Sequence, residues 1–183
     1  NFKVIFNEPK ASIKEIIFAK YGDHKLILDS AFLIKEDNFI FKIDRVDSNS
    51  ITFLHVDKNK KIFKHFIFSP DDYSMRLEIK IINLSNDVLQ LNLPISLGVL
   101  NFERDKENAR YQDVTAVSLD KTFHLNGRKE FSVNNLKFIG LRDRYFSQIV
   151  QSDSKNSIGL IKVLNKLESE VIIDYGEIKI LPG

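Results

Sequence analysis

Apolar and polar residues alternate along most of this chain, and a period of two predicts β-strands rather than helices. The clearest run extends from Leu89 to Val99, where apolar side chains alternate with Gln90, Asn92, Pro94, Ser96 and Gly98. We expect one long strand there with one buried face. Because Pro94 has no backbone N–H, this strand should lie at a sheet edge or carry a bulge at that residue.

The segment from Tyr73 to Ile81 alternates in the same way, and the residues from Asn83 to Asp87 can form a turn. The two strands on either side of that turn are therefore expected to pair as an antiparallel hairpin. Further strands are predicted at 12–21, 25–28, 39–43, 51–56, 62–68, 113–119, 136–141, 145–150, 157–163 and 171–180. Polar connectors of hairpin length at 44–50 and 57–61 indicate a β-meander.

Two segments do not follow this pattern. Asn101 to Gln112 is polar without a strong apolar stripe, which is typical of a surface loop with room for a helical turn. In Ile158 to Glu168, the side chains of Ile161, Leu164 and Leu167 would share one face of a helix. Both a short helix and a strand with its turn are therefore open for that segment.

Together these segments predict an all-β chain of about a dozen strands, packed as two sheets in one domain. The length of 183 residues fits one domain with a sizeable core. A content of 15 Phe with only 7 Gly and 4 Pro favours half-buried pleated surfaces. Because residue 1 is Asn rather than Met, we interpret the chain as a piece of a longer protein.

Charge and composition exclude several classes of function. The 27 Lys and Arg nearly balance 25 Asp and Glu, and a net charge of +2 disfavours a protein that binds nucleic acid. The absence of Cys excludes disulfides, thiolate zinc sites and thiol nucleophiles. No apolar run approaches the roughly 20 residues that cross a bilayer as a helix.

The familiar catalytic motifs are missing from the sequence. There is no Gly-rich phosphate loop, no zinc-binding His-Glu-x-x-His, no calcium loop and no nucleophile elbow. The four histidines are His24, His55, His65 and His124. His55 and His65 lie on neighbouring predicted strands, but their spacing places them diagonally at best, so packing or surface roles are favoured over a metal site or an acid–base pair.

Other candidate groups also have simple structural interpretations. The basic residues at 57–61, together with Lys64, are typical of a solvated hairpin tip, with anionic lipid headgroups as the functional alternative. The acidic pairs Asp71–Asp72 and Glu168–Glu170 could serve glycoside chemistry, although a turn is favoured for the first pair. An aromatic set could stack on sugars, although core packing is favoured for it: Phe131, Phe138, Tyr145 and Phe146. A charged triplet is typical of a solvated corner with local ion pairs: Arg142, Asp143 and Arg144.

Four stretches stand in an order that resembles a known family. They read KHFIFSPDDY at 64–73, LEIKIINLS at 77–85, FIGLRDRYF at 138–146 and IKILPG at 178–183. They resemble the large periplasmic domain of the YidC family of bacterial membrane protein insertases. The matching positions are Phe66, Phe68, Pro70, Tyr73, Asn83, Gly140, Tyr145, Phe146, Pro182 and Gly183. Residues 11–21 are similar to the opening pattern of that domain, with Ala11 and Ser12 where the family has two glycines, and Phe138 stands where Trp is common.

The resemblance implies a β-supersandwich of the galactose mutarotase type, on the periplasmic face of the bacterial inner membrane. It implies an insertase domain without catalytic residues, cofactor or metal, which assists membrane protein insertion through protein contacts or as a spacer. Its partners would be translocon components and client membrane proteins, and the fragment would be monomeric. The family's final strand, linking helix and membrane region would lie beyond Gly183. The alternative is a carbohydrate-binding or mutarotase-like sugar-modifying β-sandwich.

Overall fold

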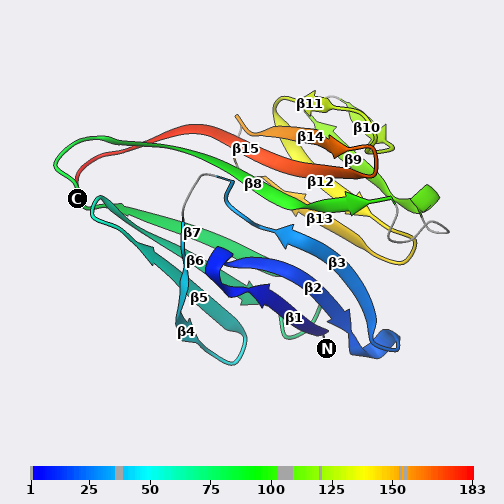
Figure 1. Ribbon diagram of the computed structural model, residues 1–183, viewed down its shortest axis with the longest axis horizontal. Coiled ribbons are helices and arrows are strands. Elements are labelled where there is room, and N and C mark those ends of the chain that lie inside the picture. The colour runs from blue at the N-terminus through cyan, green and yellow to red at the C-terminus, as the bar shows by residue number, and fades with distance from the viewer. Residues whose placement is uncertain (1, 36–38, 103–108, 120, 153, 155) are drawn as a thin grey trace. The chain divides into compact units, whose positions relative to one another are not determined.

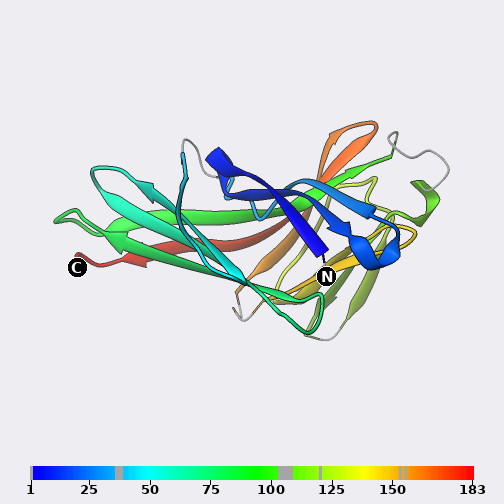
Figure 2. The same ribbon diagram turned by 90° about the horizontal axis from the view of Figure 1, so that it is seen from below.

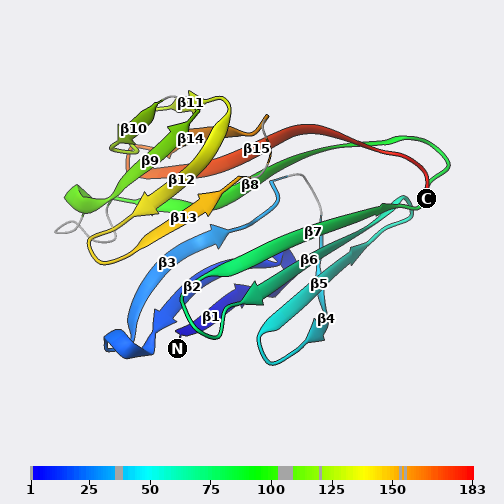
Figure 3. The same ribbon diagram turned by 180° about the vertical axis from the view of Figure 1, so that it is seen from behind.

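A computed structural model describes residues 2–35, 39–102, 109–119, 121–152, 154 and 156–183. Within these ranges there are fifteen β-strands and three short 3-10 turns, and no α-helix (Figure 1). The all-β class expected from the alternating pattern is therefore confirmed. The views in Figure 2 and Figure 3 show the same strands from below and from behind.

The elements follow one another along the chain as β1 (Phe2–Asn7), η1 (Glu8–Lys10), β2 (Ser12–Phe18), η2 (Ala19–Tyr21), β3 (His24–Ala31), β4 (Lys42–Val46), β5 (Ser50–Val56), β6 (Lys60–Phe68), β7 (Met75–Asn83), β8 (Leu89–Asn101), η3 (Ala109–Tyr111), β9 (Asp113–Ser118), β10 (Thr122–Leu125), β11 (Phe131–Val133), β12 (Leu136–Arg142), β13 (Ser147–Gln151), β14 (Ile158–Asn165) and β15 (Glu168–Ile180). Among the described residues, the ladders form four sheets, in the orders β1-β2-β3, β4-β5-β6-β7, β10-β9-β12-β13 and β11-β14-β15-β8.

The chain forms two compact units. Unit 1 contains Asn1–Ile27, Glu36–Leu91 and Glu177–Gly183, and unit 2 contains Leu28–Lys35 and Asn92–Gly176. The strands β3, β8 and β15 contribute residues to both units.

Unit 1 is a sandwich of the sheet β1-β2-β3 and the meander β4-β5-β6-β7. The aromatic ring of Phe6 on β1 lies 5.1 Å, between ring centroids, from Phe53 on β5 and also from Phe66 on β6. Phe53 and Phe66 are fully buried. These three rings join the two layers, and their edge-to-face and tilted geometries are those that aromatic pairs prefer.

Unit 2 also has two layers, and one glycine sets how closely they approach. Gly159 on β14 lies under the side chains of Leu136, Val133 and Ile139. A Cβ at Gly159 would stand 3.0 to 3.3 Å from atoms of these three side chains. A side chain at this position would therefore have to displace these core side chains by a few tenths of an ångström.

The long strand predicted at 89–99 is β8, and its expected place at a sheet edge is confirmed. Its burial differs from the expected single buried face. The side chains of Gln90 and Asn92 are exposed, but Ser96 and Gly98 are buried. Within unit 2, Ser96 exchanges backbone hydrogen bonds with Phe32 and Leu33, so residues 32–35 pair along part of the edge of β8.

The hairpin predicted between β7 and β8 is wrong. The described ladders place β7 beside β6 in one sheet, while β8 pairs with β15 in another. The expected turn is present, but Asn83 holds it with its side chain. That amide donates to the carbonyl oxygens of Asp87 and Ile180, which directs the chain toward the end of β15.

Both ambiguous segments are partly resolved. Residues 158–165 form the strand β14, so the helical alternative is wrong. In the predicted loop at 101–112, η3 supplies a helical turn, and residues 103–108 lie outside the described part of the chain. The first strand of the meander begins at Lys42 rather than Phe39. Strands β1, β10 and β11 were not expected.

Candidate functional site

The histidines do not gather into a reactive group. In the β5–β6 ladder, His55 is opposite Ile62 and His65 is opposite Thr52. Because Ile62 and His65 are three positions apart, the two imidazoles project from opposite faces of the sheet. The packing and surface roles predicted for them are confirmed, since His55 is buried in unit 1 and His65 lies 3.8 Å from the Glu78 carboxylate.

The other two histidines lie elsewhere. His24 begins β3 directly after Gly22 and Asp23, which both adopt positive φ angles and form a tight turn. His124 lies on the short strand β10 of unit 2, where its Nδ1 is 3.3 Å from the Thr115 hydroxyl. In the residues that the structure describes, no cluster of three or more histidine or carboxylate side chains is arranged to hold a metal ion.

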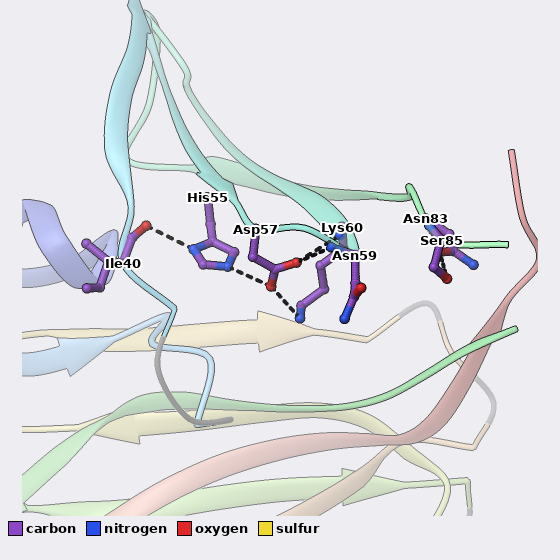
Figure 4. A network of polar contacts seen from close by, with 7 residues as sticks. All are labelled: Ile40, His55, Asp57, Asn59, Lys60, Asn83 and Ser85. Atoms are coloured by element: carbon purple, nitrogen blue, oxygen red, sulfur yellow. Dashed lines mark hydrogen bonds and ion pairs between the residues drawn. The ribbon is translucent and has the colours of Figure 1, made fainter. Parts of the chain in front are cut away.

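A polar network closes the β5–β6 hairpin (Figure 4). The Nδ1 atom of His55 donates to the carbonyl oxygen of Ile40 at 3.0 Å, because a carbonyl only accepts. On its other side, the imidazole Nε2 lies 3.4 Å from the carboxylate of Asp57. The ammonium of Lys60 donates to that carboxylate at 2.8 Å.

Asp57 also bonds to the turn itself. Its Oδ1 accepts hydrogen bonds from the backbone amides of Asn59, at 2.7 Å, and Lys60, at 2.9 Å. Partial burial acts to raise the pKa of Asp57, but these amides, Lys60 and His55 outweigh it and hold the pKa well below its usual range. The carboxylate therefore stays ionised and anchors the turn. An ionised carboxylate has no proton to donate, so Asp57 is unsuited to act as a general acid.

Lys64 contradicts the prediction of a solvated basic tip. Its side chain is fully buried in unit 1. The ammonium donates to the carbonyl oxygen of Ala11 and lies 5.5 Å from the centroid of the Phe41 ring and 5.4 Å from that of Phe66. Burial lowers the pKa of Lys64 to about 7. Strand alternation explains the error, since Lys64 is on the same face of β6 as Ile62 and Phe66.

Asn83 joins two of the motif stretches. Its buried side-chain amide donates to Asp87 O at 2.8 Å and to Ile180 O at 3.0 Å, although Ile180 is 97 positions away. Its Oδ1 accepts from the amide and the hydroxyl of Ser85, at 2.9 and 2.8 Å. The stretch that ends in Pro182 and Gly183 is therefore held beside the turn that follows β7.

The other motif residues of the first stretch separate into core and surface. Phe66 is buried, and Phe68 packs on Phe2 with ring centroids 6.0 Å apart. Pro70 and the following residues form the turn expected there, in which the Ser69 hydroxyl accepts from the amides of Asp71 and Asp72. Tyr73, predicted to begin a strand, precedes β7 and is 45% exposed.

The motif residues of unit 2 lie around the β12–β13 turn. Gly140 is in β12, where a Cβ would stand 3.2 Å from the carbonyl oxygen of Gln148. The carboxylate of Asp143 accepts from the amides of Tyr145 and Phe146, each at 2.7 Å. Arg142 pairs with Asp113, which agrees with the predicted charged corner of local ion pairs.

The acidic and aromatic candidates for sugar chemistry have other contacts. Glu170 is buried and receives the Lys35 ammonium at 2.8 Å, while Glu168 accepts from the side-chain amides of Asn101 and Asn165. Phe131 packs on Phe123, with ring centroids 5.2 Å apart. Tyr145 lies beside the Arg144 guanidinium, 5.3 Å from the ring centroid.

Neither a scan against protein-family models nor a search of curated proteins found a match. Among solved structures, the chain is similar to a galactose mutarotase related enzyme from Lactobacillus acidophilus, with a TM-score of 0.69 over 100% of this chain and 90% of that one. The two sequences are 14% identical, so the likeness shows the fold alone. The chain has the galactose mutarotase-like β-sandwich fold, as expected. In the described ranges, no helix is long and apolar enough to cross a membrane.

Proposed function

We propose that this chain is a periplasmic domain of a YidC-family membrane protein insertase, on the outer face of the bacterial inner membrane. In this proposal the domain has no catalytic role. It assists the insertion and folding of membrane proteins through contacts with translocon components and clients, or by spacing and orienting the membrane part.

The observation that carries the proposal is the hydrogen bond from Asn83 to Ile180. Asn83 and the segment that ends in Pro182 and Gly183 both match the family pattern in sequence. The 3.0 Å bond joins them. The bond therefore ties one matching residue, Asn83, to the stretch that contains two others, Pro182 and Gly183.

A second observation concerns Ala11, which stands where the family pattern has glycine. Ala11 adopts a φ of 44° and a ψ of 49°, a left-handed conformation that favours glycine. The backbone at this position therefore has the geometry that explains a glycine in the pattern. The galactose mutarotase-like fold supports the proposal as well, since the resemblance implies that fold.

The experiment uses the full-length protein in cells depleted of their own insertase. Three forms are compared: the intact protein, a form without residues 1–183, and a form in which an unrelated rigid domain of similar size replaces them. We expect the deletion to reduce insertion of client proteins, measured by protease protection. Restoration by the unrelated domain would assign a spacer role, and failure to restore would assign a role in protein contacts. Equal insertion by all three forms would contradict the proposal.

The second candidate is a carbohydrate-binding or mutarotase-like domain. It is favoured by the similar solved structure, which is called a galactose mutarotase related enzyme. Proton transfer in mutarotation requires an acid and a base that converge on one sugar. His55 and His65 face opposite sides of their sheet, which counts against such a pair. Polarimetry of fresh galactose tests this candidate, which predicts a rate above that of buffer and a loss of rate on replacing one histidine by Gln.

A further inference from the structure

Two exposed tyrosines form a surface feature of unit 1. The rings of Tyr21, at the end of η2, and Tyr73, in the turn before β7, have centroids 6.2 Å apart and are tilted by 47°. Tyr21 is 54% exposed and Tyr73 is 45% exposed. Exposed tyrosines that lie together are typical of residues that contribute strongly to protein interfaces.

Other rings support this pair from below. Tyr73 packs against Phe18, with centroids 5.4 Å apart, and against Phe2, at 5.8 Å. Phe18 is buried, and Phe2 in turn contacts Phe68. Because Tyr73 rests on rings of the core, little side-chain entropy remains to be lost when a ligand covers its exposed face.

Acidic residues lie close to both tyrosines in the sequence. Asp71 and Asp72 are exposed and precede Tyr73 in the same turn, and Asp23 follows Tyr21 by two residues. The two turns, residues 19–24 and 69–74, contain one Lys or Arg residue, which is Lys20. Hydrogen bonds from Ser74 and Ser69 lower the pKa of Asp72, so its charge persists in mildly acidic solution.

We propose that the Tyr21–Tyr73 pair, with Asp71 and Asp72, is a docking site for an arginine- or lysine-bearing segment of a protein partner. The exposed ring faces attract a guanidinium or ammonium through their quadrupole, and the exposed carboxylates of the same turn as Tyr73 complement its charge. The carboxylates repel an anionic lipid headgroup, and they attract a cation more strongly than the hydroxyls of a neutral sugar, because a hydrogen bond between two charged groups is stronger. The inference deepens the proposed function, since it gives that domain a contact surface and a partner chemistry.

The test is a titration of the purified chain with a short peptide of alternating arginine and glycine. Because the chain has no Trp, its fluorescence comes from 5 Tyr, of which Tyr21 and Tyr73 belong to the site. We expect saturable quenching with a dissociation constant in the millimolar range or below, and amide shifts in two-dimensional NMR at residues 19–24 and 69–74. A peptide with glutamine in place of arginine should bind at least about tenfold more weakly.

Substitutions distinguish binding of the peptide at this site from its nonspecific electrostatic attraction to the chain. Tyr21→Ala and the double change Asp71→Asn with Asp72→Asn should each weaken binding about fivefold or more. The two aspartates are exposed, so the double variant keeps the fold even if Tyr73→Ala does not. Tyr145→Ala is the matched control, because Tyr145 is 56% exposed and lies beside Arg144 in unit 2.

Several outcomes would overturn the inference. These are absence of arginine-peptide binding, equal binding of the glutamine peptide, equal loss on Tyr145→Ala, and saturable binding of galactose or of anionic vesicles that Tyr21→Ala abolishes. The proposed function can survive each of them, because client insertion by the full-length protein is measured separately. Conversely, peptide binding by the parent chain that is lost in the Tyr21 and aspartate variants would support the site, even if the insertion assay contradicted the proposed function.

Discussion

The side-chain amide of Asn83 donates a hydrogen bond to the backbone carbonyl of Ile180 across 97 positions of sequence. The same buried amide holds Asp87 O and accepts twice from Ser85, so one side chain closes the turn after β7 and fixes the end of β15 in unit 1. Glutamine is longer and aspartate has no amide donors, so neither can reproduce these contacts.

Replacement of Asn83 by Ala is expected to lower the free energy of unfolding by about 2–4 kcal/mol, because it removes the hydrogen bonds that this buried side chain makes with Asp87, Ile180 and Ser85. Denaturation by urea measures the loss. The control is Asn86→Ala in the same turn, since Asn86 is exposed and should change stability by about 0.5 kcal/mol or less. Equal effects of the two changes would show that Asn83 does not anchor the turn.

Lys64 predicts a particular dependence of stability on pH. Burial lowers its pKa to about 7 in the folded chain, while an unfolded lysine has a pKa near 10.4. Between these values the unfolded state binds more protons, so this residue makes stability rise as pH increases from about 7 to about 10. Below pH 7 its cost is constant and of the order of 4 kcal/mol.

Lys64→Met should therefore remove most of that slope and raise stability at pH 6, with a smaller gain at pH 10. Urea denaturation of both proteins at several pH values gives the difference, in which other titrating groups cancel. Lys58→Met serves as the control because Lys58 is exposed. A constant difference between Lys64→Met and the parent protein over this range would contradict the buried, shifted lysine.

Ala11 tests whether the glycine that the family pattern has at this position reflects the left-handed backbone conformation. At its φ of 44° a Cβ costs roughly 1–2 kcal/mol, so Ala11→Gly relieves strain that offsets the added chain entropy. We expect a change within about 0.5 kcal/mol of zero, or a gain. Ala116→Gly, at an equally buried position in β9, should cost at least about 1 kcal/mol. A larger loss at Ala11 than at Ala116 would show that the left-handed conformation is not what this position requires.

The histidines predict the result of an enzyme assay. Because His55 is committed to Ile40 O and Asp57, and His65 projects from the other face, the rate of galactose mutarotation should equal that of buffer at every pH. Polarimetry of the parent protein and of the His55→Gln variant checks this. A rate above buffer that disappears in one histidine variant would favour the sugar-modifying alternative.

The all-β class and most strands could be predicted because alternation is a local signal, as at β7 and β8. What could not be predicted depended on distant partners. Alternation predicts a solvated face for Ser96, but its side chain is buried and its backbone pairs with Phe32 and Leu33. Lys64 was assigned to solvent by its charge, although alternation along β6 already placed it between Ile62 and Phe66. The short strands β10 and β11 contain too few residues to show a period.

The candidate site was only partly accessible from sequence. The diagonal placement of His55 and His65 followed from counting across the hairpin, and the turn at Asp71 followed from its proline. The contact between Tyr21 and Tyr73 could not be found, because it joins a turn after β2 to a turn after β6 and neither turn shows a pattern. The bond from Asn83 to Ile180 likewise depends on tertiary structure alone.

The most direct test of the central claim is client insertion by the full-length protein in proteoliposomes, measured as protection of a reporter membrane protein from added protease. The account predicts protection well above that of empty liposomes, and a reduction when residues 1–183 are deleted. Protection no greater than that of empty liposomes, together with galactose mutarotation faster than in buffer, would contradict it.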